Sequence, residues 1–172
     1  IYKLYAYLRA MDEIVEHNVF HPEWTKICEE FEKLEEKYSF DKQWCKDFDK
    51  SMISDLHTKK HTTTSMIEYC KGSGEAVGLM ISRIIGCPPK ADNFARALGR
   101  AYQIINFVRD YDDDVSRGFH YIGEDHDFYI RMFLNELSYA SGGLHYIRPE
   151  LRGAILKANK KYMEIADDIQ GL

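Results

Sequence analysis

Residues 91–116 read ADNFARALGRAYQIINFVRDYDDDVS. Apolar side chains recur in this stretch at spacings of three and four residues, which is the period of an amphipathic α-helix. They are Phe94, Leu98, Ala101, Tyr102, Ile105 and Val108. Because the same period dominates the rest of the chain and no segment alternates as a strand does, the sequence predicts an all-α bundle.

The chain has 172 residues, the size of one ordinary domain, and we expect a single domain over residues 1–172. Helical periodicity and the positions of proline and glycine set the expected boundaries. The expected helices cover residues 1–17, 23–38, 41–59, 64–86, 91–116, 126–141 and 148–170. Pro22 suits a first helical turn, and Ser65 with Glu68 predicts a capping box.

The composition excludes several classes of protein. The 23 Lys and Arg residues against 28 Asp and Glu residues give a net charge of −5, so we do not expect a nucleic-acid partner. The uninterrupted apolar runs are too short to span a bilayer. The four cysteines lack the C-x-x-C spacing of a zinc or redox site, which favours reduced thiols in a cytoplasmic protein.

A row of polar side chains runs along the expected helix over residues 91–116. Gln103, Asn106, Asp110 and Asp114 lie at steps of three, four and four residues, so a continuous helix would place them on one face. Two carboxylates one turn apart form half of a site for a hard cation.

The first expected helix carries a matching row of Tyr5, Arg9, Asp12 and Glu16, at steps of four, three and four. Like charges at this spacing repel each other, and two such pairs facing each other would repel further unless a cation lay between them. Carboxylate ligands favour Mg²⁺, and Arg9 with Arg109 would supply donors for phosphate oxygens.

Plainer interpretations of these residues also exist. Acidic pairs at this spacing arise often by chance in an acidic chain, and an Asp-rich run is commonly a solvated helix face. A calcium loop starting at Asp110 is excluded, because Val115 and Tyr121 stand where that loop needs Gly and Glu. His57 and His61 have no third ligand nearby, so we interpret them as surface histidines and not as a zinc site.

Glycines interrupt the expected helix over residues 64–86. Gly72, Gly74 and Gly78 do not have the G-x-G-x-x-G spacing, and no strand precedes them, so a dinucleotide-binding fingerprint is rejected. Each glycine costs a helix about 1 kcal/mol relative to alanine. We expect close helix packing, room for a ligand beside the backbone, or both, to offset this cost.

Four motifs together resemble the squalene/phytoene synthase family, whose members join prenyl diphosphates head to head. YAYLRAMDEIVE (residues 5–16) resembles the first acidic motif of the family. QIINFVRDYDDD (residues 103–114) resembles the second, Q-x-x-N-x-x-R-D-x-x-x-D. Tyr69-Cys70 opens the glycine-rich helix between them, and residues 158–165 resemble the last helix.

The resemblance implies an isoprenoid-synthase helical bundle around a central cavity, with a role for each motif residue. The residues implied to bind Mg²⁺, or Mn²⁺ in its place, are Asp12, Glu16, Asp110 and Asp114. The residues implied to contact the substrates are Tyr5, Arg9, Gln103, Asn106 and Arg109 at the diphosphate end, with Ser73 and Val77 beside the prenyl tail. Tyr69 and Tyr162 would face the carbocation.

Several residues depart from the family pattern. Glu16 replaces the usual Asp, and Phe119 stands where R-G-R-x-Y would have its second arginine. The Gly72-Ser73-Gly74 segment is closer to the variant of archaeal and some bacterial phytoene synthases. The chain is shorter than family members, so we expect that the natural protein begins upstream of Ile1 and that an N-terminal helix and some connecting segments are missing.

The resemblance implies condensation of two geranylgeranyl diphosphates to phytoene through a cyclopropylcarbinyl diphosphate, with Mg²⁺ and without NADPH. The alternatives are a squalene or dehydrosqualene synthase that uses farnesyl diphosphate, and a non-catalytic helical protein that binds prenyl lipid. We expect a cytoplasmic protein, with peripheral membrane association and oligomeric state left open. Ala76, and Val77 to Met80, are the residues predicted to limit tail length.

Overall fold

The structure is a computed structural model that describes residues 1–17 and 19–171. Its elements in chain order are α1 (Tyr2–His17), α2 (Trp24–Tyr38), α3 (Lys42–Ser54), α4 (Thr63–Cys70), the π-helix η1 (Lys71–Ala76), α5 (Val77–Ile84), the 3₁₀ turn η2 (Pro89–Ala91), α6 (Asp92–Arg109), α7 (Tyr111–Ser116), α8 (His126–Ser141), the 3₁₀ turn η3 (Leu144–Tyr146) and α9 (Pro149–Gln170). The only β pairing in the described residues is an isolated bridge between Lys60 and His120. The prediction of an all-α fold is confirmed.

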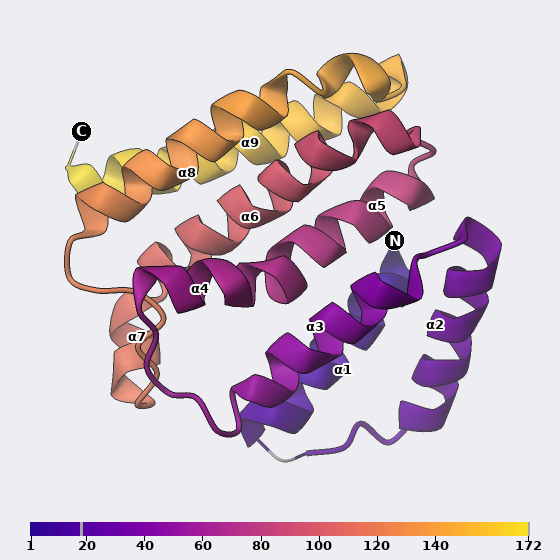
Figure 1. Cartoon of the computed structure of the whole chain (residues 1–172), viewed down its shortest axis with the longest axis horizontal. Helices are drawn as coiled ribbons and strands as arrows, with labels where there is room; N and C mark the ends of the chain where they lie inside the picture. The colour runs from indigo at the N-terminus through magenta and orange to yellow at the C-terminus, as the bar shows by residue number, and fades with distance from the viewer. Residues whose placement is uncertain (18, 172) are drawn as a thin grey trace.

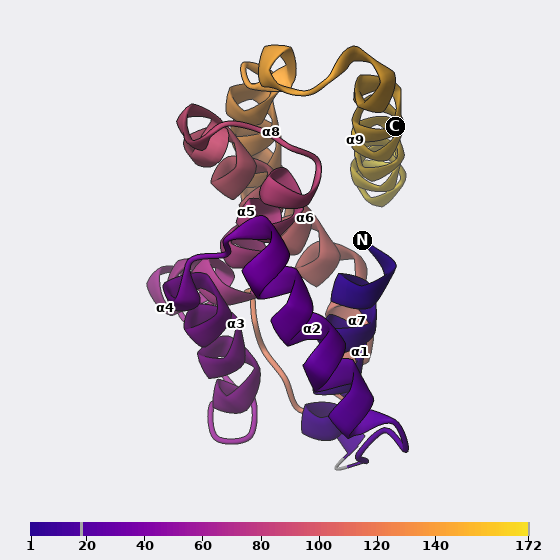
Figure 2. The ribbon, with the colours of Figure 1, turned by 90° about the vertical axis from the view of Figure 1, so that its right-hand side faces the viewer.

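The helices form layers with α6 at the centre (Figure 1). α6 packs against α8 and α9 on one side and against η1 and α5 on the other, and α3 packs on η1. Figure 2 shows α1, α2 and α3 on the opposite side of this central layer from α8 and α9. One hydrophobic cluster runs from α1 through α6 to α8, and Leu4, Met66, Ile105 and Phe133 are almost fully buried in it.

Glycines allow the central helices to approach each other closely. A Cβ on Gly74 would lie 2.7 Å from the carbonyl oxygen of Gly99, and a Cβ on Gly99 would overlap the carbonyl oxygen of Gly74. A Cβ on Gly78 would overlap the carbonyl oxygen of Ala95 in the same way. The expected helix over residues 64–86 therefore packs backbone to backbone on α6, and its middle section is the π-helix η1.

The expected helix over residues 91–116 is broken in two. α6 ends at Arg109, Asp110 has φ −96° and ψ 8°, and α7 begins at Tyr111. The prediction of one continuous helix from Gln103 through Asp110 to Asp114 is therefore wrong. The backbone instead turns at the first carboxylate, and α7 lies at one end of the bundle (Figure 1).

Other boundaries also differ from the expectation. α3 ends at Ser54, so His57 and His61 lie in a loop and share no helix face. Thr62 caps α4: its side chain accepts from the Ser65 N–H, and the Ser65 hydroxyl accepts from the Thr62 N–H. Ser65 is thus the third helical residue and not the cap.

The second helix begins at Trp24, so Pro22 lies in the preceding turn.

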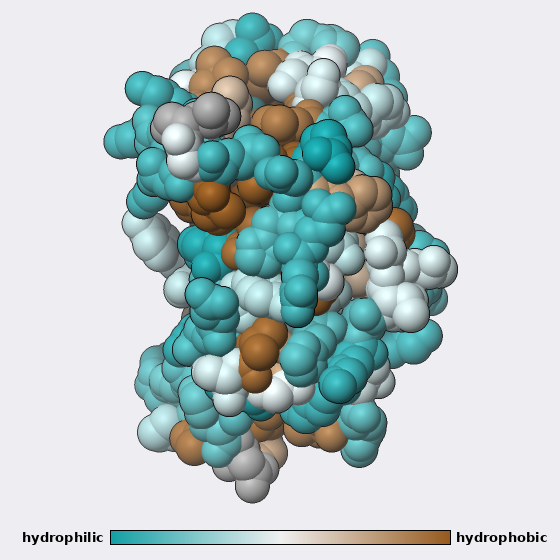
Figure 3. Space-filling view, turned by 90° about the vertical axis from the view of Figure 1, so that its left-hand side faces the viewer, coloured by the Kyte–Doolittle hydropathy of each residue, from teal (hydrophilic) through white to brown (hydrophobic). Residues whose placement is uncertain are grey.

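Within the described residues, no helix combines the length and the apolar character that a membrane crossing requires. Figure 3 shows the side of the molecule that lies at the left in Figure 1. Its surface is mostly hydrophilic, and its hydrophobic residues form separate patches.

Candidate functional site

A polar cleft and an apolar cavity adjoin inside the bundle. The first, which we call the acidic cleft, has a volume of about 420 Å³ and lies between α1, α3, α6 and α7. The second, the apolar cavity, has a volume of about 250 Å³ and lies between α5, α6, α8 and α9. Both are lined by the same four residues at their common wall, Ser73, Val77, Gln103 and Asn106.

The acidic cleft brings together the residues of both acidic motifs. The predicted site residues that line it are Tyr5, Arg9, Asp12, Glu16, Tyr69, Ser73, Val77, Gln103, Asn106, Arg109, Asp110 and Asp114. The residues from positions 5–16 come from α1, and those from positions 103–114 come from α6, the break at Asp110, and α7. Two segments that are about a hundred residues apart in the sequence therefore line the same cleft.

Arginines neutralise part of the acidic cleft. Arg109 binds Asp110 with both ends of its guanidinium, Nε to Oδ1 at 2.7 Å and Nη2 to Oδ2 at 2.6 Å. Arg117 bridges α1 and α7, because it contacts Glu16 at 3.0 Å and Asp114 at 2.6 Å. Sequence reasoning did not assign Arg117 to the site, although Arg117 and Gly118 match the first two residues of the family pattern R-G-R-x-Y.

Burial, with a smaller contribution from neighbouring carboxylates, raises the pKa values of two carboxyl groups in the cleft. Burial raises the pKa of Asp12 to about 6, and the neighbouring Glu16 adds to that rise. Burial also raises the pKa of Asp114 to about 6, even though Arg117 works in the opposite direction. The raised pKa values mean that the ionised forms of Asp12 and Asp114 are unfavourable in the cleft. A bound cation would stabilise these ionised forms and lower both pKa values.

The donor set fits a hard divalent cation, but it is not assembled into a ligand cluster. Within residues 1–17 and 19–171, no three His, Cys, Asp or Glu side chains are grouped closely enough to hold a metal ion. Asn106 adds a second observation, because its Oδ1 is buried at the common wall without a hydrogen-bond partner in the described residues. Buried amide oxygens normally have a partner, so a ligand or cation at this wall would satisfy it.

Asp55 is a cleft residue that sequence reasoning missed. The residue is only 5% exposed, and its Oδ2 accepts a hydrogen bond of 2.6 Å from the Tyr69 hydroxyl. Burial raises the pKa of Asp55 to about 6. Asp55 belongs to no motif in the expected helix over residues 41–59, so only the packing of the loop after α3 against α4 reveals its place in the cleft.

An aromatic cluster surrounds the Tyr69 ring. Its members are His61, Phe107 and Tyr121, with ring centres 5.5, 6.0 and 5.3 Å from that of Tyr69. Phe119 is buried and stacks on Tyr121. His61 is therefore part of the site's packing and not the surface histidine that the sequence suggested.

Tyr162 does not line the cleft. It stacks on Tyr102, with ring centres 4.3 Å apart, and the Tyr102 hydroxyl contacts Asn159 Oδ1 at 2.5 Å. Tyr102 itself lines the apolar cavity. The structure therefore brings Tyr162 behind the cavity wall, one ring away from the space that it was expected to face.

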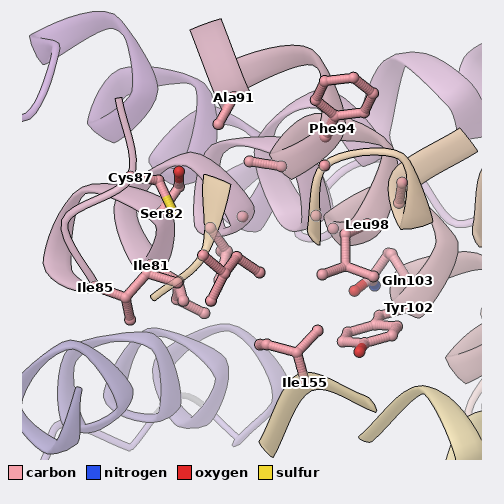
Figure 4. Close-up of a pocket in the computed structure, with 18 of the residues that line it drawn as sticks. Ile81, Ser82, Ile85, Cys87, Ala91, Phe94, Leu98, Tyr102, Gln103 and Ile155 are labelled. Carbon is pink, nitrogen blue, oxygen red and sulfur yellow. The ribbon is translucent and has the colours of Figure 1, made fainter. Parts of the chain in front are cut away.

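The apolar cavity extends away from the cleft along α5. Figure 4 shows Tyr102 and Gln103 at one end, and Ile85 and Cys87 at the other. Ala76 and Met80, which the sequence suggested as tail-limiting residues, are buried but are not among the lining residues. Of the suggested residues, Val77 and Gly78 do line the cavity, and Ile81 lines it one turn beyond Val77.

The sequence profile of the squalene/phytoene synthase family matches residues 3–126. The chain belongs to this family. The matched range contains α1 to α7 and so includes both acidic motifs and every carboxylate of the acidic cleft. Squalene/phytoene synthases are prenyltransferase-type enzymes of isoprenoid biosynthesis that use prenyl diphosphates, so membership implies a head-to-head prenyl condensation.

A solved structure supports the fold of this squalene/phytoene synthase family member. The crystal structure of squalene synthase HpnC from Alicyclobacillus acidocaldarius superimposes with a TM-score of 0.81 at 14% sequence identity. The similarity covers 98% of this chain and 81% of that chain. No curated protein sequence matches the chain.

Proposed function

We propose that the chain condenses two geranylgeranyl diphosphates to phytoene through a cyclopropylcarbinyl diphosphate. The observation that supports this most directly is the common wall of the acidic cleft and the apolar cavity, formed by Ser73, Val77, Gln103 and Asn106. A molecule with a diphosphate head and a prenyl tail needs a charged site that opens into an apolar one. Family membership supplies the head-to-head type of reaction.

Asp12, Glu16, Asp110 and Asp114 are proposed to hold Mg²⁺, with Mn²⁺ as the alternative. When bound, such ions supply neutralisation of the charge that grows on the leaving diphosphate as the carbon–oxygen bond breaks. Arg9 and Arg109 line the same cleft and would donate to diphosphate oxygens. The Gln103 and Asn106 side chains lie where head and tail meet and would orient the allylic carbon at the common wall.

Tyr69 is proposed to face the carbocation. Its hydroxyl is held by Asp55 at 2.6 Å, which fixes the ring in the wall of the cleft. The rings around it exclude water and present π faces, and both properties favour an allylic cation over its capture by water. Tyr162 would act through Tyr102, on which it stacks.

Two observations support the choice of the C20 substrate. The Gly72-Ser73-Gly74 segment resembles phytoene synthases, and the apolar cavity follows α5 from Val77 past Ile81 to Ile85. A squalene or dehydrosqualene synthase that uses farnesyl diphosphate is the second candidate. A non-catalytic protein that binds prenyl lipid would use the same two spaces.

An incubation with labelled C15 and C20 prenyl diphosphates tests the proposal. With Mg²⁺ alone, we expect the C20 substrate to be consumed faster and to give a C40 hydrocarbon with a central double bond. NADPH should change neither the rate nor the product, because phytoene forms by loss of a proton. A reduced product that appears only with NADPH would exclude phytoene synthesis and favour squalene synthesis.

Ile81→Phe should shift substrate preference toward the shorter tail. Ile81 lines the apolar cavity one turn beyond Val77, so a larger ring there fills space that a C20 tail needs more than a C15 tail. Overpacking costs about 1–3 kcal/mol, which predicts a roughly fivefold or larger fall in the C20 to C15 ratio of kcat/KM. Leu156→Phe is the matched control, since Leu156 is exposed on α9 beside the lining residue Ile155. An unchanged ratio in Ile81→Phe would mean that the tail lies elsewhere.

A further inference from the structure

The arginines of the acidic cleft are already bound to carboxylates. Arg9 contacts Glu13 at 3.3 Å, Arg109 holds Asp110, and Arg117 holds Glu16 and Asp114. A prenyl diphosphate that enters the cleft must therefore compete with carboxylates for these three cations. A cation that stands beside the cleft and is not paired with a carboxylate would bind the diphosphate at a lower cost.

Lys59 is such a cation. Its Nζ lies 3.5 Å from the centre of the Phe119 ring, over the face of that ring. Within residues 1–17 and 19–171, Lys59 forms no ion pair with a carboxylate. Contact with an aromatic face is weaker than a charge-assisted hydrogen bond to phosphate, so the ammonium can exchange one for the other.

The backbone fixes Lys59 next to the cleft. The His120 N–H donates to the Lys59 carbonyl at 2.7 Å, and the His61 N–H donates to the His120 carbonyl at 2.9 Å. The loop after α3 is thereby joined to the loop after α7. Phe119, under the lysine, stacks on Tyr121, and Tyr121 lines the cleft.

The charge of Lys59 also reaches the cleft wall. Burial raises the pKa of the cleft residue Asp55, and the Lys59 ammonium acts against that rise. The ring that supports the ammonium belongs to Phe119, which stands at the position where the family pattern has an arginine. Phe119 therefore replaces an arginine of the family pattern, and its ring contacts the ammonium group of Lys59.

We propose that Lys59 is a diphosphate-binding residue of this site and takes the place of the arginine that Phe119 replaces. This inference rests on the proposed function, since it assigns a contact to the same substrate. The four-carbon stem of lysine gives the ammonium the freedom to leave the ring and donate to a diphosphate oxygen at the cleft wall.

The test measures the affinity of the full chain for inorganic diphosphate in the presence of Mg²⁺ by titration calorimetry, together with kcat and KM for geranylgeranyl diphosphate. Lys59→Gln should weaken diphosphate binding roughly tenfold and raise KM by a similar factor, because one charge-assisted contact is lost. Lys59→Arg, which keeps the charge, should bind nearly as tightly as the natural chain.

Lys60→Gln is the matched control, because Lys60 is the exposed neighbour in the same loop. It should leave affinity and KM unchanged. In Lys59→Gln, the additional change Phe119→Arg should restore the lost affinity, which a purely structural role of Lys59 would not produce. Diphosphate binding by Lys59→Gln equal to that of the natural chain would overturn the assignment of Lys59 alone. Absence of diphosphate binding by the natural chain would overturn the proposed function as well.

Discussion

Asp110→Asn and Asp12→Asn should each lower turnover by about 10²–10³-fold at saturating Mg²⁺, because each removes a carboxylate from the proposed cation site. Both residues line the acidic cleft, Asp12 from α1 and Asp110 from the break between α6 and α7. Asp12→Asn should also raise the melting temperature without metal, since burial and Glu16 disfavour the ionised carboxylate.

Asp112→Asn is the control for this prediction. Asp112 is exposed on α7, carries the same charge and does not line the cleft. Steady-state kinetics and thermal melts of the three variants separate loss of the site from loss of the fold. Near-normal rates in both Asp110→Asn and Asp12→Asn would show that these carboxylates hold no catalytic cation.

Gly99→Ala should lower the free energy of unfolding by about 2–3 kcal/mol, even though alanine favours helix over glycine. A Cβ at this position would overlap the Gly74 carbonyl oxygen and lie 3.3 Å from the Glu75 Cα. These are backbone atoms of η1, which cannot rotate away as a side chain would, so α6 and η1 must separate. The separation would widen the common wall of the two cavities.

Gly153→Ala provides the matched comparison. Gly153 lies in α9, and a Cβ there would meet no atom within 4 Å. This change should therefore stabilise the fold by about 0.5–1 kcal/mol through helix propensity alone. Denaturant titration of both variants measures the difference. Equal stability of Gly99→Ala and Gly153→Ala would contradict the close backbone contact between α6 and η1.

Periodicity and motif spacing were sufficient to predict the helical class and the two rows of polar residues that line the acidic cleft. Arg9, Asp12 and Glu16 occupy one helix face, and local geometry alone places them together. Asp110 and Asp114 are four residues apart in the sequence, but the sequence did not reveal the break between α6 and α7. Polar side chains next to the backbone can end a helix there, and a 3.6-residue period does not detect such an ending.

The error at Ala76 has a specific physical origin. A continuous α-helix from Tyr69 would place Ala76 and Met80 on the same side as Tyr69 and Ser73. η1 has π-type hydrogen bonds, which insert an extra residue into the turn, so the helix face that follows is rotated. Val77 and Ile81 line the cavity as a result, while Ala76 is buried against other helices.

Asp55 and Lys59 show what sequence reasoning cannot supply. Both lie in the loop region after α3, and neither belongs to a motif. Their place beside the cleft depends on the hydrogen bond from Tyr69 to Asp55 and on the backbone contacts of the loop with His120. Such long-range contacts leave no periodic trace in the sequence.

The measurement that tests the central claim most directly is the amount of diphosphate released per molecule of hydrocarbon formed. The full chain would be incubated with geranylgeranyl diphosphate, with Mg²⁺ and with a chelator in its place. Head-to-head condensation through the acidic cleft predicts two diphosphates released for each C40 hydrocarbon, and no release with the chelator. Absence of diphosphate release with Mg²⁺, or one diphosphate per product, would contradict the account.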